Sequence, residues 1–258
     1  MHRRIPVAAF VLAFPLAAQA PTITEPTIQR TRTVWFVQDA NPIGAEVGFA
    51  AEAIAWDAAN DKTFASGKNG SRIALGATTW AELATFTDLK FGKSAVKAGN
   101  HYAVLEKGKD GWALALLDPD AVRKAQLAPG VGEKQPATAL IALKSDDADA
   151  SPLHAEWKNA GDGEAELTIR FGKHRFVATA NVQGAKGAQP IALPDPRGAS
   201  RVAFGKNAFA VIDHGVPAWN DERAAQSKQA AKGTRWRLGK DWATTLDTNT
   251  PLAIGDKS

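Results

Sequence analysis

Cysteine is absent from the 258 residues, and this single absence removes several kinds of chemistry. A chain without thiols forms no disulfide, has no thiolate nucleophile and offers no cysteine-ligated zinc or iron–sulfur site. The signatures G-x-S-x-G, H-E-x-x-H and G-x-x-x-x-G-K-[ST] are absent as well, so serine hydrolases, zincins and P-loop proteins receive no support. We therefore expect no metal and no cofactor.

A strong charge of one sign is also missing. The formal net charge is +4, and removing residues 1–20 takes away Arg3 and Arg4 and leaves 29 basic against 27 acidic side chains. This balance argues against nucleic acid as a partner, which would call for a basic surface. With 45% hydrophobic and 22% charged residues, the composition is typical of a soluble globular protein.

Residues 1–20 have the pattern of a secretory signal peptide. Arg3 and Arg4 precede an apolar stretch, Val7–Ala18, that is too short for the about 20 residues needed to span a bilayer. Small residues follow in an A-x-A arrangement, so we expect cleavage after Ala20, or after Ala18 because a proline follows Ala20. Pro6, directly before the stretch, and Pro15 within it disfavour the alternative of a buried helix. No later segment is apolar enough to span a membrane, and we expect a periplasmic or extracellular protein.

The remaining chain is mostly short alternating runs broken by Gly, Asn and Asp, which predicts a mainly β, antiparallel, sandwich-like fold with short helices. Two hairpins are expected, one with its loop at 107–111 and one turning at Gly172-Lys173. Asp118-Pro119 predicts the start of a short helix, and 220–232 predicts a polar one. The organisation predicted is 1–20 signal peptide, 21–44 N-terminal segment, 45–183 first β domain, 184–199 linker and 200–258 partial second copy.

The second copy is inferred from an internal repeat. Gly70–Gly76 and Gly233–Gly239 match at an offset of 163, which also pairs Leu83 with Leu246, Leu89 with Leu252 and two threonines in between. Alternate positions match, so one strand face is repeated, and we expect all four leucines to point inward. Farther upstream, residues 47–55 match 202–210 at an offset of 155.

Several motifs resemble the bacterial domain-of-unknown-function 2911 family, which reads W-R-x-G, a threonine-rich strand, A-G-x-Y and a Trp-bearing strand. The residues that carry the resemblance are Trp236–Gly239, Thr244–Leu246, Lys97–Tyr102, Asp110–Trp112 and Phe171–Arg175. It covers about 45–183 and again about 200–258. The resemblance implies an exported, mainly β domain and supplies no activity. In the first copy Ile73-Ala74 stands in place of the W-R pair.

Histidines and carboxylates offer no clear catalytic pattern. His101, His154, His174 and His214 are far apart and form no helical ligand pair, and ordinary strand histidines explain them better than a metal site. Carboxylates such as those of Asp213, Asp221 and Glu222 could pair in space for glycosidase work, but spacing along the chain does not show it.

Tryptophan is more informative, because the chain has eight and only one tyrosine. Trp35, Trp112 and Trp157 lie in apolar or alternating runs and are expected in the core. The run 232–242 mixes indoles with basic residues, some of which must be exposed on a strand, and a solvated face with Trp236 buried is the alternative interpretation. The candidate binding residues are Arg235, Trp236, Arg237 and Trp242.

Two functions remain open. One is a non-catalytic exported module that binds an envelope component, a glycan or a protein through exposed indoles. The other is an extracytoplasmic hydrolase, which needs two carboxylates that converge in a concave pocket. The position of the carboxylates and indoles in space separates the two.

Overall fold

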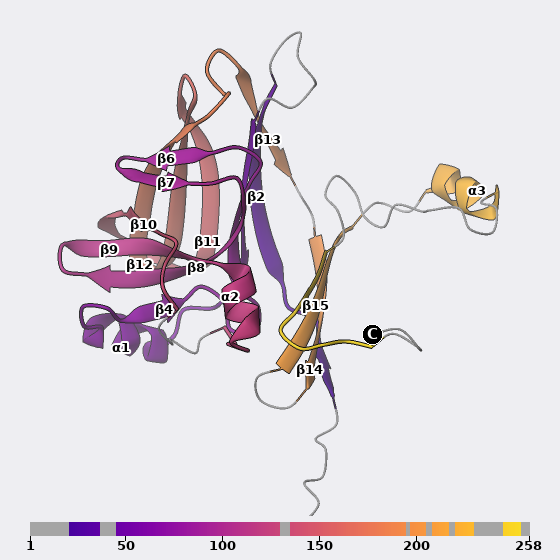
Figure 1. The fold of residues 1–258 in the computed structure, drawn as a ribbon, viewed down its shortest axis with the longest axis horizontal. Coiled ribbons are helices and arrows are strands. Elements are labelled where there is room, and N and C mark those ends of the chain that lie inside the picture. The colour runs from indigo at the N-terminus through magenta and orange to yellow at the C-terminus, as the bar shows by residue number, and fades with distance from the viewer. Residues whose placement is uncertain are drawn as a thin grey trace, which may run out of the picture.

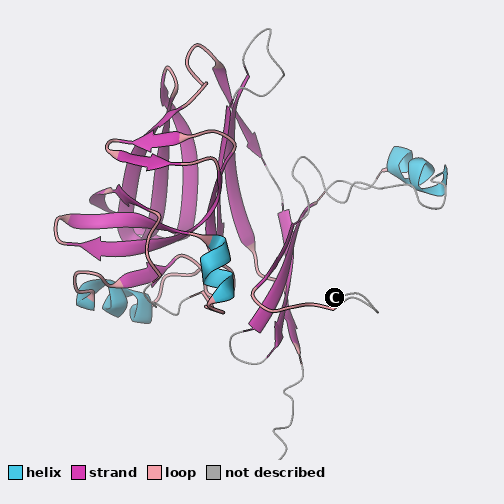
Figure 2. Cartoon of the chain, in the orientation of Figure 1, coloured by secondary structure: helices cyan, strands magenta, loops and turns pink. Residues whose placement is uncertain are grey.

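The structure, a computed structural model, describes residues 21–36, 45–129, 135–194, 197–204, 208–216, 220–229 and 245–253. These residues form three antiparallel sheets and three short helices (Figures 1 and 2), so the prediction of a mainly β, antiparallel fold is confirmed. Within this part of the chain, no helix is long and apolar enough to cross a membrane.

The helices are α1 (Ala58–Ser66), α2 (Pro119–Lys124) and α3 (Asp221–Gln229). The strands are β1 (Thr22–Thr24), β2 (Ile28–Phe36), β3 (Ala45–Glu52), β4 (Arg72–Ala74), β5 (Ala81–Thr85), β6 (Leu89–Phe91), β7 (Ser94–Val96), β8 (Gly99–Gly108), β9 (Gly111–Leu117), β10 (Ala139–Ala142), β11 (Lys144–Gly161), β12 (Glu164–Val182), β13 (Gln189–Pro194), β14 (Arg197–Phe204), β15 (Ala208–Gly215) and β16 (Thr245–Thr248).

The main body is a sandwich of two sheets. An eight-stranded sheet has the order β10-β9-β8-β5-β3-β2-β13, with β4 paired to β8, and a four-stranded sheet has the order β11-β12-β6-β7. Their facing side chains form one core, to which Trp35, Phe49 and Leu83 come from the first sheet and Trp157 and Phe171 from the second. Burial of each such side chain stabilises the fold by about 1.5–3 kcal/mol. Trp35, Trp112 and Trp157 are all buried, as the sequence predicts.

A second four-stranded sheet, β1-β14-β15-β16, stands beside the other face of the eight-stranded sheet (Figure 1). Its four strands are arranged like β13-β2-β3-β5 of the main sheet. Its edge strand β1 comes from the N-terminal segment and pairs with β14, whereas β13, which directly precedes β14 in sequence, pairs with β2 in the main sheet. The two halves of the chain therefore exchange one edge strand each. The strands β14, β15 and β16 dock as a separate layer and do not extend the sheet of the main body.

The correspondence between the two sheets extends to individual hydrogen bonds. The Thr85 hydroxyl donates to the carbonyls of Glu46 (3.2 Å) and Thr87 (2.6 Å), and the Thr248 hydroxyl donates to those of Phe209 (3.0 Å) and Thr250 (2.8 Å). Each residue of the second set lies 163 positions after its counterpart in the first set. Because Val47 pairs with Thr85 and Ala210 with Thr248, the upstream match at an offset of 155 is wrong, and β3 corresponds to β15 at 163.

The prediction that all four leucines point inward is wrong for Leu246. Leu83 and Leu89 are buried, Leu252 is half-buried, and Leu246 is 52% exposed. Leu246 lies on the same face of its strand as Leu83, since Thr248 corresponds to Thr85. The difference arises because β11 and β12 cover the face that carries Leu83, whereas the face that carries Leu246 is open.

The hairpin predicted at Gly172-Lys173 is also wrong. β12 runs through this point as one strand, and its pairing with β11 shifts register near Ser151 and Gly172. Gly172 has φ +59°, and a Cβ there would lie 2.1 Å from the ring of Trp56. The glycine is needed for a bulge under an aromatic ring, and the local sequence resembles a turn because both require a left-handed residue.

The predicted β-hairpin around residues 107–111 and the starts of two helices are confirmed, whereas the predicted linker contains strands. The hairpin with its loop at 107–111 is confirmed as β8–β9, and Asp118 caps α2 by accepting a hydrogen bond from Asp120 N (2.9 Å). α3 confirms the start of the polar helix, whose end lies outside the described residues. The 184–199 segment, expected as a linker, contains β13 and the start of β14. Pro190 and Pro194 lie on β13, an edge strand, where a missing N–H is tolerated.

Candidate functional site

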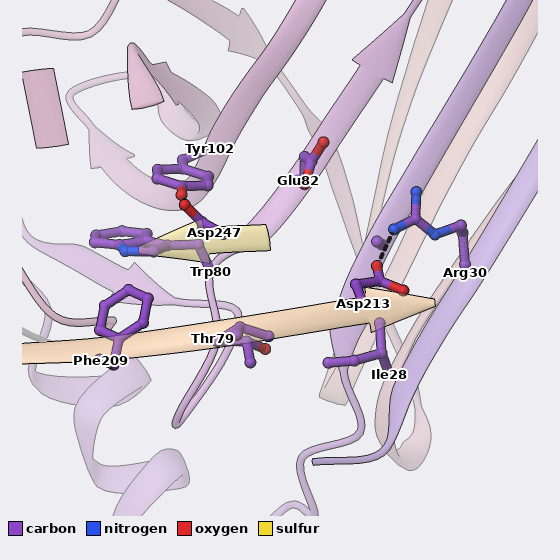
Figure 3. A pocket seen from close by; sticks show the side chains of 11 residues that line it. Ile28, Arg30, Thr79, Trp80, Glu82, Tyr102, Phe209, Asp213 and Asp247 are labelled. Atoms are coloured by element: carbon purple, nitrogen blue, oxygen red, sulfur yellow. Dashed lines mark hydrogen bonds and ion pairs between the residues drawn. The ribbon is translucent and has the colours of Figure 1, made fainter. Parts of the chain in front are cut away.

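A pocket lies between the eight-stranded sheet and the β1-β14-β15-β16 sheet (Figure 3). Its cavity volume is about 50 Å³, which leaves room for a few water-sized groups. Its lining from the main sheet and the loop before β5 is Ile28, Arg30, Ala50, Thr79, Trp80, Glu82 and Tyr102, and from the second sheet Phe209, Val211, Asp213 and Asp247. Three carboxylates thus converge on one small concave site.

Glu82 occupies the wall between two charged clusters (Figure 3). It sits on β5, where alternation turns Leu83 into the core and Glu82 toward the second sheet. Burial raises the pKa of the Glu82 carboxyl above its ordinary value; the Arg30 guanidinium opposes the shift, and the Asp247 and Asp213 carboxylates add to it. The site therefore favours a Glu82 that holds its proton and can donate as well as accept a hydrogen bond.

Arg30 and Asp213 form the first cluster, in which a guanidinium N–H donates to the carboxylate. Arg30 comes from β2 and Asp213 from β15, so the ion pair joins the two sheets. Its side chains are largely shielded from water, at 7% and 15% exposure. In such surroundings a partnered pair is tolerated and removal of one partner is costly.

Tyr102, Asp247 and Arg123 form the second cluster. The Tyr102 hydroxyl donates to the Asp247 carboxylate, and Arg123 donates to its other oxygen at 2.9 Å. Burial raises the pKa of the Tyr102 phenol, and the negative charge of Asp247 raises it further, so the hydroxyl keeps its proton. This network links β8 and α2 of the main body to β16.

Trp80 forms the aromatic wall of the pocket. Its indole stacks on the Tyr102 ring, with centroids 5.2 Å apart and planes 11° from parallel, and it also packs against the cluster containing Phe209. The Trp80 indole N–H and the Thr79 hydroxyl are buried and have no hydrogen-bond partner in the described part of the chain. Thr33, Trp35 and Trp157 also have buried polar atoms without a partner in this part of the chain, but they do not line the pocket. Thr79 and Trp80 therefore place two unused donors where a ligand could reach them.

Glu52 holds the loop that presents Trp80. Its carboxylate accepts hydrogen bonds from the backbone N–H groups of Ala77 (2.9 Å), Thr78 (2.6 Å) and Thr79 (3.1 Å). Gly76 begins this loop so tightly that a Cβ would lie 1.8 Å from the Thr79 carbonyl oxygen. The loop geometry therefore depends on a carboxylate outside the pocket and on a glycine without a side chain.

The residues proposed from sequence fall in different places. The candidates Arg235, Trp236, Arg237 and Trp242 lie outside the described residues. Of the carboxylates considered for glycosidase work, Asp213 lines the pocket. Asp221 and Glu222 are exposed on the first turn of α3 and do not line it.

Most of the pocket was missed by sequence reasoning, including Glu82, Tyr102 and Asp247. These residues lie on strands that pair only through the tertiary fold, and no spacing along the chain brings them together. One usable signal was present: the T-x-T sequences at Thr85 and Thr248 mark corresponding strand ends. They imply that residues 82–84 and 245–247 occupy corresponding strands.

Comparison with known proteins gives no relative. No protein-family model, curated protein or solved structure matches the chain. The resemblance to the domain-of-unknown-function 2911 family therefore stays a prediction, and the chemistry of the pocket is the basis for a functional interpretation.

Proposed function

We propose that the protein is an exported, non-catalytic binding module whose inter-sheet pocket holds an uncharged, hydroxyl-rich ligand, such as the terminal sugar of an envelope glycan. The two corresponding sheets are proposed to be an internal repeat that clasps this ligand. The observation that carries the proposal is the mixture of donors and acceptors that converge in the pocket.

The hydrogen-bonding inventory favours hydroxyl groups. The Trp80 indole can only donate a hydrogen bond, and an ionised carboxylate can only accept one. The Thr79 hydroxyl and a protonated Glu82 carboxyl can each donate and accept. An ammonium ion could satisfy only the acceptors, and a carboxylate ligand only the donors. A hydroxyl donates and accepts, so a polyol matches the whole set.

The charges favour a neutral ligand. Asp213 is paired with Arg30, and Asp247 is paired with Arg123, which also binds the exposed Asp120, so each pocket carboxylate has a cationic partner. Glu82 contributes little charge when it holds its proton. A charged ligand would have to break one of these pairs or leave its own charge uncompensated in a shielded site, and either is costly.

Hydrolysis by a carboxylate pair is the second candidate, and one observation favours it. The Glu82 carboxyl, whose pKa burial raises, lies beside the Asp213 and Asp247 carboxyls, and acid–base catalysis by a carboxylate pair uses one carboxyl with a raised pKa beside a second one. Against it, Asp213 and Asp247 each already bind an arginine, which leaves neither free to act as a base. If a bound glycan is cleaved, release of reducing ends that Glu82→Gln abolishes while binding persists would establish this alternative.

The binding proposal is tested by titrating the purified protein with neutral mono- and oligosaccharides and with amino and acidic sugars, by calorimetry. Thr79→Val is the informative variant, because the hydroxyl has no partner in the described protein and its loss leaves no internal bond broken. We expect neutral sugars to bind and Thr79→Val to weaken their binding about 2- to 13-fold, which corresponds to one net hydrogen bond.

Thr33→Val is the matched control. Its hydroxyl is equally buried and without a partner among the described residues, but it does not line the pocket. Affinity should stay unchanged in this variant. The proposal is wrong if no neutral sugar binds, if charged sugars bind more tightly, or if both threonine variants have the same effect.

A further inference from the structure

The outer face of the β1-β14-β15-β16 sheet, the side away from the pocket, is unusually apolar. Alternation and strand pairing place on it Ile23, Gly198, Ser200, Val202, Phe204, Ala208, Ala210, Ile212, His214, Leu246 and Thr248. No Asp, Glu, Lys or Arg is among them. Four of the seven large hydrophobic residues exposed in the described part of the chain lie here: Ile23, Phe204, Ile212 and Leu246.

The inner face of the same sheet carries Asp213 and Asp247 at the pocket and an apolar patch beside them. Ala199, Phe209 and Val211 are buried against the main body. An antiparallel sheet with one face in water normally alternates apolar and polar residues. A sheet with apolar side chains on both faces has the composition of a middle layer, and the residues that the structure describes cover only one of its two faces.

The corresponding face of the main sheet shows what covers such a surface. Ile212 corresponds to Phe49, Leu246 to Leu83 and Phe204 to Trp35, and all three counterparts are buried in the sandwich core. The cover there is another antiparallel sheet, β11-β12-β6-β7. The geometry of this face thus fits a second apolar sheet laid across it.

We infer that the outer face of the β1-β14-β15-β16 sheet packs against the same face of a second copy of this chain. An isologous contact needs a surface complementary to itself, and a flat apolar face without charged groups meets that condition because no like charges are brought together. The two outer sheets then form a sandwich of the same kind as the main body, and the two pockets face away from the contact.

The area of the face sets the strength of the contact. β14 and β15 have eight residues each, β16 has four and β1 has three; at about 3.3 Å per residue and about 4.8 Å between strands they cover about 360 Å² for each copy. The total of about 700 Å² is in the range of weak, transient contacts. We therefore expect a dimer that dissociates on dilution through the micromolar range.

The test is sedimentation velocity of the full chain from low to high micromolar concentration, together with Leu246→Lys and a matched control. Leu140→Lys is that control, since Leu140 is a strand leucine that is 47% exposed, close to the 52% of Leu246, but lies on β10. The parent chain and Leu140→Lys should shift from monomer to dimer with concentration. Leu246→Lys should weaken dimerisation at least 10-fold, because it places a charge in the contact.

A cross-linking experiment gives an independent result, even if the lysine variants fold poorly. The chain has no cysteine, so Ile212→Cys and Leu140→Cys each carry a single thiol. Ile212 pairs with Ser200 and Leu246 near the middle of the face, close to where a twofold axis would pass. Oxidation should yield a disulfide-linked dimer for Ile212→Cys and little for Leu140→Cys. A chain that stays monomeric at all concentrations, or equal effects at the two leucines, would overturn the inference.

Discussion

Replacement of Asp247 by alanine probes the contact that holds the second sheet against the main body. The substitution leaves the Tyr102 hydroxyl, on a ring that is almost fully buried, without its carboxylate acceptor. A hydrogen bond to a charged group contributes about 1.5–3 kcal/mol. The paired Arg123 is partly exposed and adds at most about 1 kcal/mol. We expect a loss of about 3 kcal/mol, or about 6–12 °C in Tm for a chain of this size.

Asp120→Ala is the matched control for Asp247→Ala. Asp120 binds the same guanidinium, at 2.6 Å, but its side chain is 89% exposed. An exposed pair contributes little, so its removal should lower Tm by no more than about 2 °C. Both variants are compared by differential scanning calorimetry.

A double-mutant cycle with Tyr102→Phe isolates the coupling between the hydroxyl and the carboxylate, which we expect to be about 1.5–3 kcal/mol. Asp247→Ala melting like Asp120→Ala, or a coupling near zero, would show that this network does not hold the sheet. The reasoning about how the two halves dock would then be wrong.

Three further predictions concern the elements around the pocket and the main core. Glu52→Ala removes the acceptor of three loop N–H groups and should lower the free energy of unfolding in urea by at least about 1.5 kcal/mol. In this variant the change in Trp80 fluorescence on ligand binding should also become smaller. Gly172→Ala should cost about 2–5 kcal/mol, from a left-handed φ plus a clash with Trp56, whereas Gly92→Ala, with φ +56° and open space, should cost only about 1–2 kcal/mol. Burial lowers the pKa of His174 in the folded protein, so as the pH falls the unfolded chain becomes protonated at this residue before the folded one does. Stability should therefore fall as the pH drops below about 6.5, and His174→Gln should reduce this pH dependence.

The parts of the fold that depend on neighbours in sequence were predictable. The β8–β9 hairpin follows from two alternating runs around a glycine-bearing loop, and α2 follows from Asp118 and Pro119. Gly172 was misread because a bulge and a tight turn require the same left-handed residue. In the segment expected to be a linker, β13 was missed because prolines there mark an edge strand and not a break.

The pocket was not predictable, since it depends on pairing between distant strands. Asp247 and Tyr102 are 145 residues apart, and Arg30 and Asp213 are 183 apart. Their contact requires the β1-β14-β15-β16 sheet to dock on the main sheet, and no local pattern specifies that docking. The inward position predicted for Leu246 was wrong for a related reason: periodicity identifies the face of a strand but not whether another layer covers it.

The most direct test of the central claim, that ligand binds between the two sheets, is the ¹H–¹⁵N spectrum of the tryptophan indoles during titration with a sugar that binds. The chain has eight tryptophans, and Trp80→Phe assigns the resonance of interest by its disappearance. Trp35 and Trp157 serve as internal controls, because their indole N–H groups are also buried and without a partner among the described residues but lie outside the pocket. The account predicts that the Trp80 resonance shifts in proportion to occupancy while those of Trp35 and Trp157 stay in place. A Trp80 signal that does not move, with shifts confined to Trp236 or Trp242, would contradict it.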